Sequence, residues 1–329
     1  MIRSKSVLLM MIVLSTIISH VFTGHPEPSW PIAQIDDYVL NIIVLAGIHI
    51  TLAVSLNLVN GHTGQFSLGH AGFMAVGAYG SAWLTQVRGK EFLAGLEFFN
   101  GAAPVVGFFL ATVFGGLVAA VAGFAVGLPS LRLNGDYLAI VTLGFGEIIR
   151  VVIQNTNSLG GARGLTGIPI RTTLGLTFGI AACAIYVAAS LVKSTYGRGF
   201  LAVRDDEIAA ESMGINATKY KVTAFVVGAF FAGLSGALYA HFIGYITPEG
   251  FNFLRSVDVV VMVILGGMGS TAGVSVAAVG LTVLNELLRQ AEQYRMIAFA
   301  LLLIVLMILR PQGLIGDPAR WFRARRANR

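Results

Sequence analysis

The residues best suited to ionic contacts lie in one charged segment, Gly197–Lys221, which separates two long uncharged runs. Acidic side chains in the first turn of a helix are stabilised by the positive end of the helix dipole. We therefore expect a short helix that ends at Gly214 and opens with Arg204, Asp205, Asp206 and Glu207. Such a helix offers charge-assisted hydrogen bonds to another protein.

The other face of this predicted helix is apolar, because it carries Ala209, Ala210 and Met213. A helix that lies on a membrane surface usually carries Lys and Arg on its polar face, whereas the polar face here is acidic. We therefore favour docking on a soluble protein partner. A solvated loop helix between two spans is the alternative.

A second set of polar residues, the polar run Gly61–Gly72, enters an apolar stretch. Polar groups in lipid are costly unless they face the helix bundle or a water-filled path. This predicts an element of a translocation path or gate, with broken helix geometry. Hydrogen bonds that cap or pack helices near the interface are an equal alternative. The side chains concerned are His62, Gln65, Ser67 and His70.

Acid–base pairs with a spacing of three residues share one face of a helix, and two of them lie near the ends of predicted spans. Glu147 and Arg150 form one pair, and Glu286 and Arg289 form the other. Near the end of a span such a pair is more often structural, and we favour this interpretation. A path-lining role for Glu147 and Arg150 stays open.

Several kinds of chemistry are not expected of this chain. His62 and His70 have no third ligand nearby, so we expect no metal site. Cys183 is the only cysteine, which excludes a disulfide framework. The sequence contains no G-x-x-x-x-G-K-[ST] run, so we expect it neither to bind nor to hydrolyse ATP, and to hold no cofactor. Energy and substrate capture must then come from other chains.

The chain that positions these residues is strongly apolar: 56% of its 329 residues are hydrophobic and 12% are charged. An ordinary soluble domain carries about 25% charged residues. Long continuous apolar runs predict an all-α, polytopic membrane protein with about 8–10 transmembrane segments, because barrel strands would alternate in polarity over about ten residues. The expected segments are 6–23, 38–59, 65–87, 103–128, 136–154, 173–192, 221–246, 256–270, 272–289 and 294–310.

Lys and Arg concentrate in cytoplasmic loops. We therefore expect the N-terminus, the loop Pro129–Gly135, the charged segment and the Arg-rich tail on the cytoplasmic side. The run Val257–Leu288 must then cross twice, with a break at Gly266–Ser270, and re-entrant or tilted geometry stays open for it. The first apolar run, Val7–Phe22, is expected to be retained as a span rather than cleaved as a signal.

The order of several motifs resembles a known family. Ala209 and Ala210 precede Gly214 with the spacing found in the cytoplasmic coupling loop of ABC importer permeases. Over about residues 38–316 the chain is similar to the LivM-type permeases of branched-chain amino acid ABC importers. The motifs that carry this resemblance are Leu131–Ile148, Arg204–Ala210, Leu265–Ser270, Tyr294–Met296 and Arg310–Leu314.

The resemblance implies a permease domain at 38–316 with its coupling loop at 197–221. An N-terminal span with an external loop (1–37) precedes it, and a basic cytoplasmic tail (317–329) follows. It also implies a second homologous permease, two ATP-binding subunits and a periplasmic binding protein in a bacterial inner membrane. The expected function is uptake of leucine, isoleucine and valine, with no ATPase activity in the chain itself. The ATPase-coupling residues would be Arg204, Asp205, Asp206, Glu207, Ala209, Ala210 and Gly214.

Other functions stay open from the sequence. Related permeases also carry other amino acids, amides or urea, so an amide or urea ABC importer permease is the main alternative. An ion-coupled secondary transporter would use Gly61–Gly72 and Gly266–Gly273 as paired helix breaks, although charges suited to H⁺ or Na⁺ coupling are sparse within the spans. A membrane-embedded enzyme would need a catalytic cluster, which the sequence does not contain.

Overall fold

The structure, a computed structural model, describes residues 36–87, 103–130 and 135–291, together with eight single residues between 297 and 314. The predicted segment 6–23, the tail 317–329 and most of the predicted segment 294–310 lie outside the described residues. Within the described ranges nearly all regular structure is helical, which confirms a polytopic helical membrane protein.

Five described helices are long and apolar enough to cross a membrane. Apolar runs adopt this form because a helix satisfies its own backbone hydrogen bonds in lipid. The predicted segments match these helices to within a few residues at each end. They are α2 (Asp37–Asn57), α5 (Ala103–Ser130), α6 (Asp136–Gln154), α7 (Leu174–Lys193) and α10 (Ala217–Ile243).

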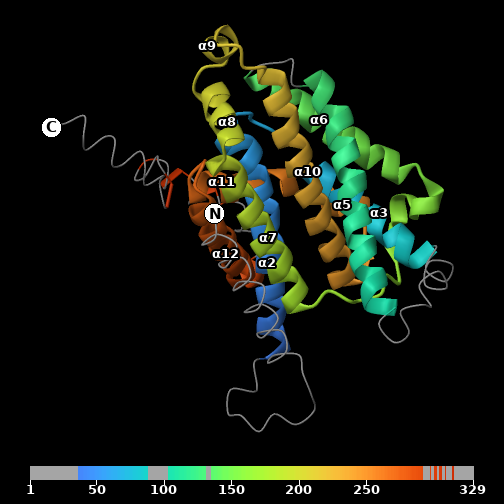
Figure 1. The fold of residues 1–329 in the computed structure, drawn as a ribbon. Helices are drawn as coiled ribbons and strands as arrows, with labels where there is room; N and C mark the ends of the chain where they lie inside the picture. Colours follow the sequence, from blue (N-terminus) through green and yellow to red (C-terminus); the bar gives the residue numbers. More distant parts are fainter. Residues whose placement is uncertain are drawn as a thin grey trace.

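Helix α10 lies at the centre of the bundle, against α2, α3 and α5 (Figure 1). Glycine allows this close approach: a side chain at Gly77 would collide with the backbone of Gly233, and one at Gly236 with the carbonyl of Met74. These glycines therefore serve close helix packing, which is common in bundles within lipid.

The predicted segment 65–87 is helical only from His70 onward, and the helix break expected within Gly61–Gly72 is present. Helix α2 passes into a π-helical turn, η1 (Leu58–His62), and an irregular stretch follows up to Gly69. Helix α3 (His70–Ala82) then begins, and a second π-helical turn, η2 (Trp83–Val87), completes it. Gly64 has φ +70°, a conformation that ends a helix and that glycine adopts without strain.

Two short helices form a hairpin, α11 (Phe253–Gly266) and α12 (Thr271–Leu287). The turn between them contains Gly267 (φ +96°) and Gly269 (φ +89°), which confirms the predicted break at Gly266–Ser270. With 14 and 17 residues, each arm is shorter than the ~20 residues of a full span. A 3₁₀ turn, η7 (Leu288–Ala291), follows α12.

Loops at one end of the bundle are joined by a small antiparallel ladder of β1 (Leu165–Thr166) and β2 (Tyr245–Ile246). Beside it are three 3₁₀ turns: η4 (Asn157–Leu159), η5 (Gly161–Arg163) and η6 (Pro248–Phe251). We call this the ladder end. It contains the loops that follow α6 and α10.

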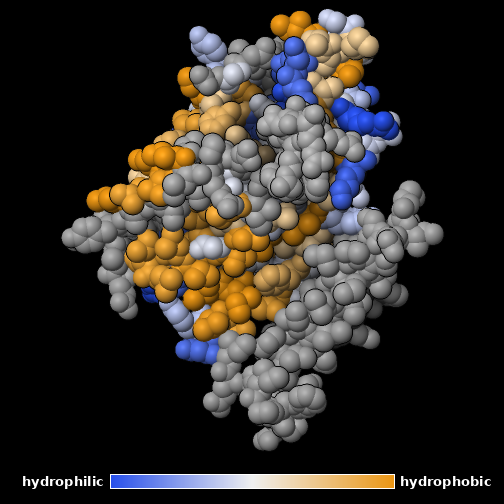
Figure 2. Space-filling model, turned by 90° about the vertical axis from the view of Figure 1, so that its left-hand side faces the viewer, coloured by the Kyte–Doolittle hydropathy of each residue, from blue (hydrophilic) through white to orange (hydrophobic). Residues whose placement is uncertain are grey.

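The opposite end carries α8 (Thr195–Asp205) and α9 (Glu207–Ser212), the uppermost labelled helix in Figure 1. Hydrophilic side chains gather toward this upper end in Figure 2, above a broad hydrophobic surface. We call it the α9 end. The charged segment of the sequence therefore forms a polar cap on an apolar bundle.

Candidate functional site

The charged segment folds as two helices, so the prediction of one helix that opens at Arg204 is wrong. Arg204 and Asp205 lie in the last turn of α8. Asp206 has an extended backbone, and its Oδ1 accepts a hydrogen bond of 3.0 Å from the Ala209 backbone N–H. Asp206 is thus the N-cap of α9, a role that suits a short carboxylate. Gly214, with φ +82°, follows the end of α9 as predicted.

Helix α9 exposes two large apolar side chains at the polar end of the molecule: Ile208 is 80% exposed and Met213 is 82% exposed. Acidic side chains flank them. Exposed apolar groups rimmed by charge, outside the hydrophobic belt, are typical of a protein contact. We define the α9 surface as the exposed residues Asp205, Asp206, Ile208, Ala209, Glu211 and Met213.

Two of the predicted coupling residues face inward and hold α9 in place. Glu207 Oε1 lies 2.5 Å from Lys221 Nζ, and the Lys221 side chain is only 6% exposed. Ala210 is buried in a small cluster with Val203 and Ala217. The ion pair and this apolar cluster fix α9 on the first turns of α10, so Glu207 and Ala210 position the α9 surface rather than belong to it.

Arg204 also points into the molecule, with 19% of its side chain exposed. Its Nη2 forms an ion pair of 2.9 Å with Asp205 Oδ1, and its Nη1 donates a hydrogen bond of 3.4 Å to the carbonyl oxygen of Gly61. The charged segment is thereby joined to the polar run, two motifs that the sequence presents separately.

The turn of the α11–α12 hairpin meets the same point. The backbone N–H of Gly269 donates a hydrogen bond of 2.8 Å to Asn57 Oδ1, and a side chain at Gly61 would collide with the Gly269 backbone. Gly313 leaves no room for a side chain beside Gly267. We call Gly61, Gly267, Gly269 and Gly313 the glycine junction.

The junction settles the relative placement of these motifs. The backbone N–H of Leu314 donates to the carbonyl oxygen of Leu265 at 2.8 Å, so Gly313 and Leu314 reach the hairpin turn. The charged segment, the hairpin turn and the last described residues therefore lie at the α9 end together.

The predicted path residues of the polar run are all buried: His62, Gln65, Ser67 and His70. Between Gly64 and Ser67 burial alternates from residue to residue, as in extended chain, which directs Gln65 and Ser67 into the bundle. His70 Nε2 lies 2.7 Å from Ser55 Oγ on α2, a contact that suits helix packing. The His70 contact fits the helix-packing alternative for this residue, while a path role for the polar run stays a prediction.

Some buried polar atoms of this region have no hydrogen-bond partner within the described part of the chain. They are Gln65 Nε2 and Oε1, Ser67 Oγ and Asn57 Nδ2. Leaving such an atom unsatisfied costs about 1–3 kcal/mol. Because these atoms are covered by this chain itself, another large protein cannot reach them as the chain is folded here. Water or the polar groups of a small solute are the partners that fit.

The other predicted path residues, Glu147 and Arg150, pair with each other on α6. Arg150 Nη2 lies 2.7 Å from Glu147 Oε2, and both side chains are partly exposed, which supports the structural interpretation. Glu286 pairs in the same way with Arg289 at 3.0 Å. Helix α6 instead reaches the polar run through Thr142, whose Oγ1 accepts a hydrogen bond of 3.1 Å from the Leu68 backbone N–H.

The sequence interpretation missed Thr142 and Asn57, which are single polar residues within apolar segments. Asn57 had a detectable signal, because Asn57 and Asn60 interrupt the apolar run just before Gly61. Thr142 gave none, because a threonine in a span usually bonds its own helix. Among the described residues, no group of three or more His, Cys, Asp or Glu side chains is placed to hold a metal ion.

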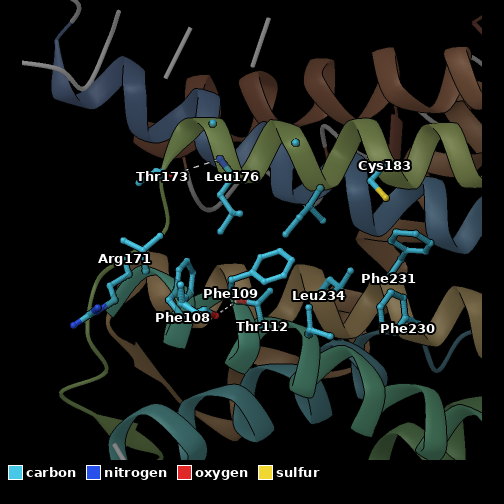
Figure 3. Close-up of a pocket in the computed structure, with 16 residues that line it drawn as sticks. Phe108, Phe109, Thr112, Arg171, Thr173, Leu176, Cys183, Phe230, Phe231 and Leu234 are labelled. Atoms are coloured by element: carbon cyan, nitrogen blue, oxygen red, sulfur yellow. Dashed lines mark hydrogen bonds between the residues drawn. The ribbon is translucent and has the colours of Figure 1, made fainter. Parts of the chain in front are cut away.

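A separate groove lies between α5, α7 and α10 and has a volume of about 900 Å³ (Figure 3). Side chains that point into it include Phe109, Leu176 and Leu234, while Arg171 lies at one end with its guanidinium directed away. Its lining is almost wholly apolar, so it suits hydrocarbon rather than a polar solute. None of the predicted site residues lines this groove.

The chain matches, over residues 38–309, the protein family described as the permease component of branched-chain amino acid transport systems. The high-affinity branched-chain amino acid permease LivM of Escherichia coli K12 is 37% identical over 322 residues, covering 87% of this chain and 72% of the relative. The probable LivM permease of Methanocaldococcus jannaschii is 24% identical, covering 85% of this chain and 94% of the relative.

A second kind of permease is also similar to part of the chain. The LivH permease of Escherichia coli K12 is 31% identical over 128 residues, which cover 38% of this chain and 41% of the relative. No solved structure matches the chain.

Proposed function

The chain belongs to the family of permease components of branched-chain amino acid transport systems, and we propose that it forms part of the membrane path of an ATP-driven importer for these amino acids. It is a multi-pass membrane permease subunit. Because the sequence contains no phosphate-binding ATPase motif, the energy would come from separate ATP-hydrolysing subunits.

The observation that carries this proposal is the connection from the α9 surface to the interior. The α9 surface presents Ile208 and Met213 within an acidic rim. Directly behind it, Arg204 donates to the Gly61 carbonyl at the glycine junction. A partner that binds the α9 surface would thus be one side chain away from the break between α2 and α3.

This geometry supports a mechanism in which ATP-driven motion of the partner displaces α8 and α9 together. The Glu207–Lys221 ion pair holds α9 on α10, so α10 would follow the displacement. Arg204 would at the same time shift the polar run and the hairpin turn against each other. The backbones at the glycine junction are closely packed, so they cannot shift independently of the helices that carry them. A small displacement of this junction would therefore change how whole helices pack.

The polar run would line part of the path. An amino acid carries an ammonium and a carboxylate group, which must exchange water for protein hydrogen bonds as they cross the membrane. Gln65 offers both a donor and an acceptor, and Ser67 adds a hydroxyl. His62 is buried in the same run. The polar run is therefore our proposed path element, and Glu147 and Arg150 are a less favoured one.

The complete importer would contain a second, homologous permease, two ATP-binding subunits and a periplasmic substrate-binding protein. The partial similarity to LivH supports the second permease. We place the assembly in the bacterial inner membrane with the α9 end in the cytoplasm, because the charged segment and the basic tail carry Lys and Arg there.

The proposal is tested by purifying the chain with its partner subunits, reconstituting the complex in proteoliposomes and measuring uptake of labelled leucine with and without ATP inside. We expect uptake that requires ATP, the ATPase subunits and the binding protein. Uptake driven by an ion gradient without ATPase subunits would overturn it. A ligand screen on the binding protein that selects urea or amides, and no branched-chain amino acid, would replace the proposed substrate.

A further inference from the structure

Arg255 is a charged residue that the function proposed above does not use. It lies in the first turn of α11, and its Nη2 is 3.1 Å from His49 Nε2. His49 is the middle residue of the 26-residue membrane segment Asp37–His62. The guanidinium of Arg255 therefore lies beside the middle of α2, but toward the ladder end of the bundle, because Arg255 follows η6 closely and lies against Tyr239 in the last turns of α10.

The direction of each hydrogen bond around this arginine follows from the donors present. A guanidinium can only donate, so His49 Nε2 must accept and His49 Nδ1 must carry the proton. Nδ1 then donates to Thr282 Oγ1 at 2.8 Å, and the Thr282 hydroxyl donates to the Ala278 carbonyl at 2.6 Å. This chain of bonds joins α11, α2 and α12 and keeps His49 uncharged.

Aromatic rings hold the other side of the guanidinium. Arg255 Cζ lies 5.2 Å from the centre of the Tyr239 ring, a cation–π distance. Tyr239 is in turn supported by an edge contact with Phe251, at 6.1 Å between ring centres. The arginine is thus oriented by two neutral groups, one from α2 and one from α10.

In the described part of the chain the ion pairs given by the structure join residues other than Arg255, and the acidic residue nearest to it in sequence is Asp258, three residues further along α11. A charge within a membrane segment is costly and usually marks a functional site. A guanidinium has five N–H donors in a fork that matches a carboxylate, and only one is engaged by His49. The side chain is half-buried rather than sealed.

We propose that Arg255 binds the carboxylate group of the transported amino acid within the bundle, toward its ladder end. This inference rests on the proposed function and names a substrate-binding residue for it. The start of α11 adds backbone N–H groups of positive partial charge beside the guanidinium. Leu254, exposed at the same turn, offers apolar contact to an aliphatic side chain.

The test uses the complete complex in nanodiscs and proteoliposomes, with Arg255→Met and Arg255→Lys and, as control, Arg163→Met at an exposed position of the ladder end. In the unaltered complex we expect leucine to raise the thermal unfolding temperature and leucinol, which lacks the carboxylate, to leave it unchanged. Arg255→Met should lose the response to leucine and lower uptake at saturating binding protein by about tenfold or more. Arg163→Met should match the unaltered complex.

Normal uptake and a normal leucine response in Arg255→Met would overturn the inference. If Arg255→Met does not fold, Arg255→Lys tests the inference instead, because lysine keeps the positive charge but lacks the forked N–H donors of the guanidinium. A leucine response weakened about fivefold or more supports the inference, and an unchanged response overturns it. Failure of the unaltered complex to transport any branched-chain amino acid would overturn the proposed function instead.

Discussion

Arg204 Nη1 donates to the carbonyl oxygen of Gly61 across 3.4 Å, although 143 residues separate the two in the sequence. The contact joins a surface suited to a soluble partner with the break between α2 and α3. Arg204 therefore acts through Gly61 and Asp205 rather than as part of the exposed surface. Four predictions follow from this connection and from the residues around it.

Replacing Arg204 with Met should uncouple the importer. The α9 surface stays intact, so ATPase subunits should still bind and hydrolyse ATP, while motion no longer reaches Gly61. We expect leucine uptake per ATP hydrolysed to fall about tenfold, within the usual range of coupling energies between sites. Arg198→Met, on an exposed position of α8, is the control and should keep the normal ratio. An unchanged ratio in Arg204→Met would exclude this role.

The glycine junction should tolerate no side chain. A Cβ at Gly61 would collide with the Gly269 backbone, and neither backbone can move freely. We expect Gly61→Ala to lower the free energy of unfolding by about 2 kcal/mol, as overpacking generally does. Gly280→Ala is the matched control, because nothing lies within 4 Å of a Cβ at Gly280. Thermal unfolding of the two purified variants gives the comparison, and equal stability would contradict the close packing.

Negative charges introduced on the α9 surface should weaken the binding of the ATPase subunits to this chain. Ile208→Asp and Met213→Asp put carboxylates where an apolar contact is expected, and we expect affinity for those subunits to fall about tenfold. Co-purification and titration with ATPase subunits measure this. Tyr245→Asp introduces the same charge at an exposed position of the ladder end and should have no effect. Full affinity in both α9 variants would place the partner elsewhere.

Gln65→Leu should separate stability from function. The substitution removes two buried atoms that lack partners, so the free energy of unfolding should rise by about 1 kcal/mol or more. Uptake should fall at least about tenfold, because a polar group of the path is lost. Gln86→Leu is the control: Gln86 bonds the Thr166 carbonyl at the ladder end, and its loss should neither stabilise the protein nor reduce uptake. A more stable and fully active Gln65→Leu variant would remove Gln65 from the path.

Much of the fold could be predicted because its causes are local. The helices α5, α6, α7 and α10 follow continuous apolar runs, and the hairpin break follows the Gly266–Ser270 cluster. The N-cap at Asp206 was harder to predict from the sequence, because the residues Arg204–Glu207 could equally well form one turn of a single helix. Only the preference of a carboxylate for the Ala209 N–H decides between them.

The candidate site was predictable in its parts but not in its assembly. Gly61, Arg204 and Gly269 belong to motifs that were each visible in the sequence, yet their meeting depends on how α2, α8 and the hairpin pack. The residues near each motif in the sequence do not indicate which distant segment that motif will contact. The contacts of Arg255 were hidden for the same reason, because its approach to His49 and Tyr239 depends on how α11 packs against α2 and α10.

The ladder of Leu165–Thr166 with Tyr245–Ile246 ties the loop after α6 to the loop after α10. Further backbone bonds, from Ile168 to Gly244 and from Arg171 to His241, tighten this clasp. Helix α10 is thus pinned at its outer tip and braced to α9 at its inner tip. If a partner at the α9 surface displaces α10, we therefore expect the helix to pivot about these bonds at the ladder end rather than to slide along its axis.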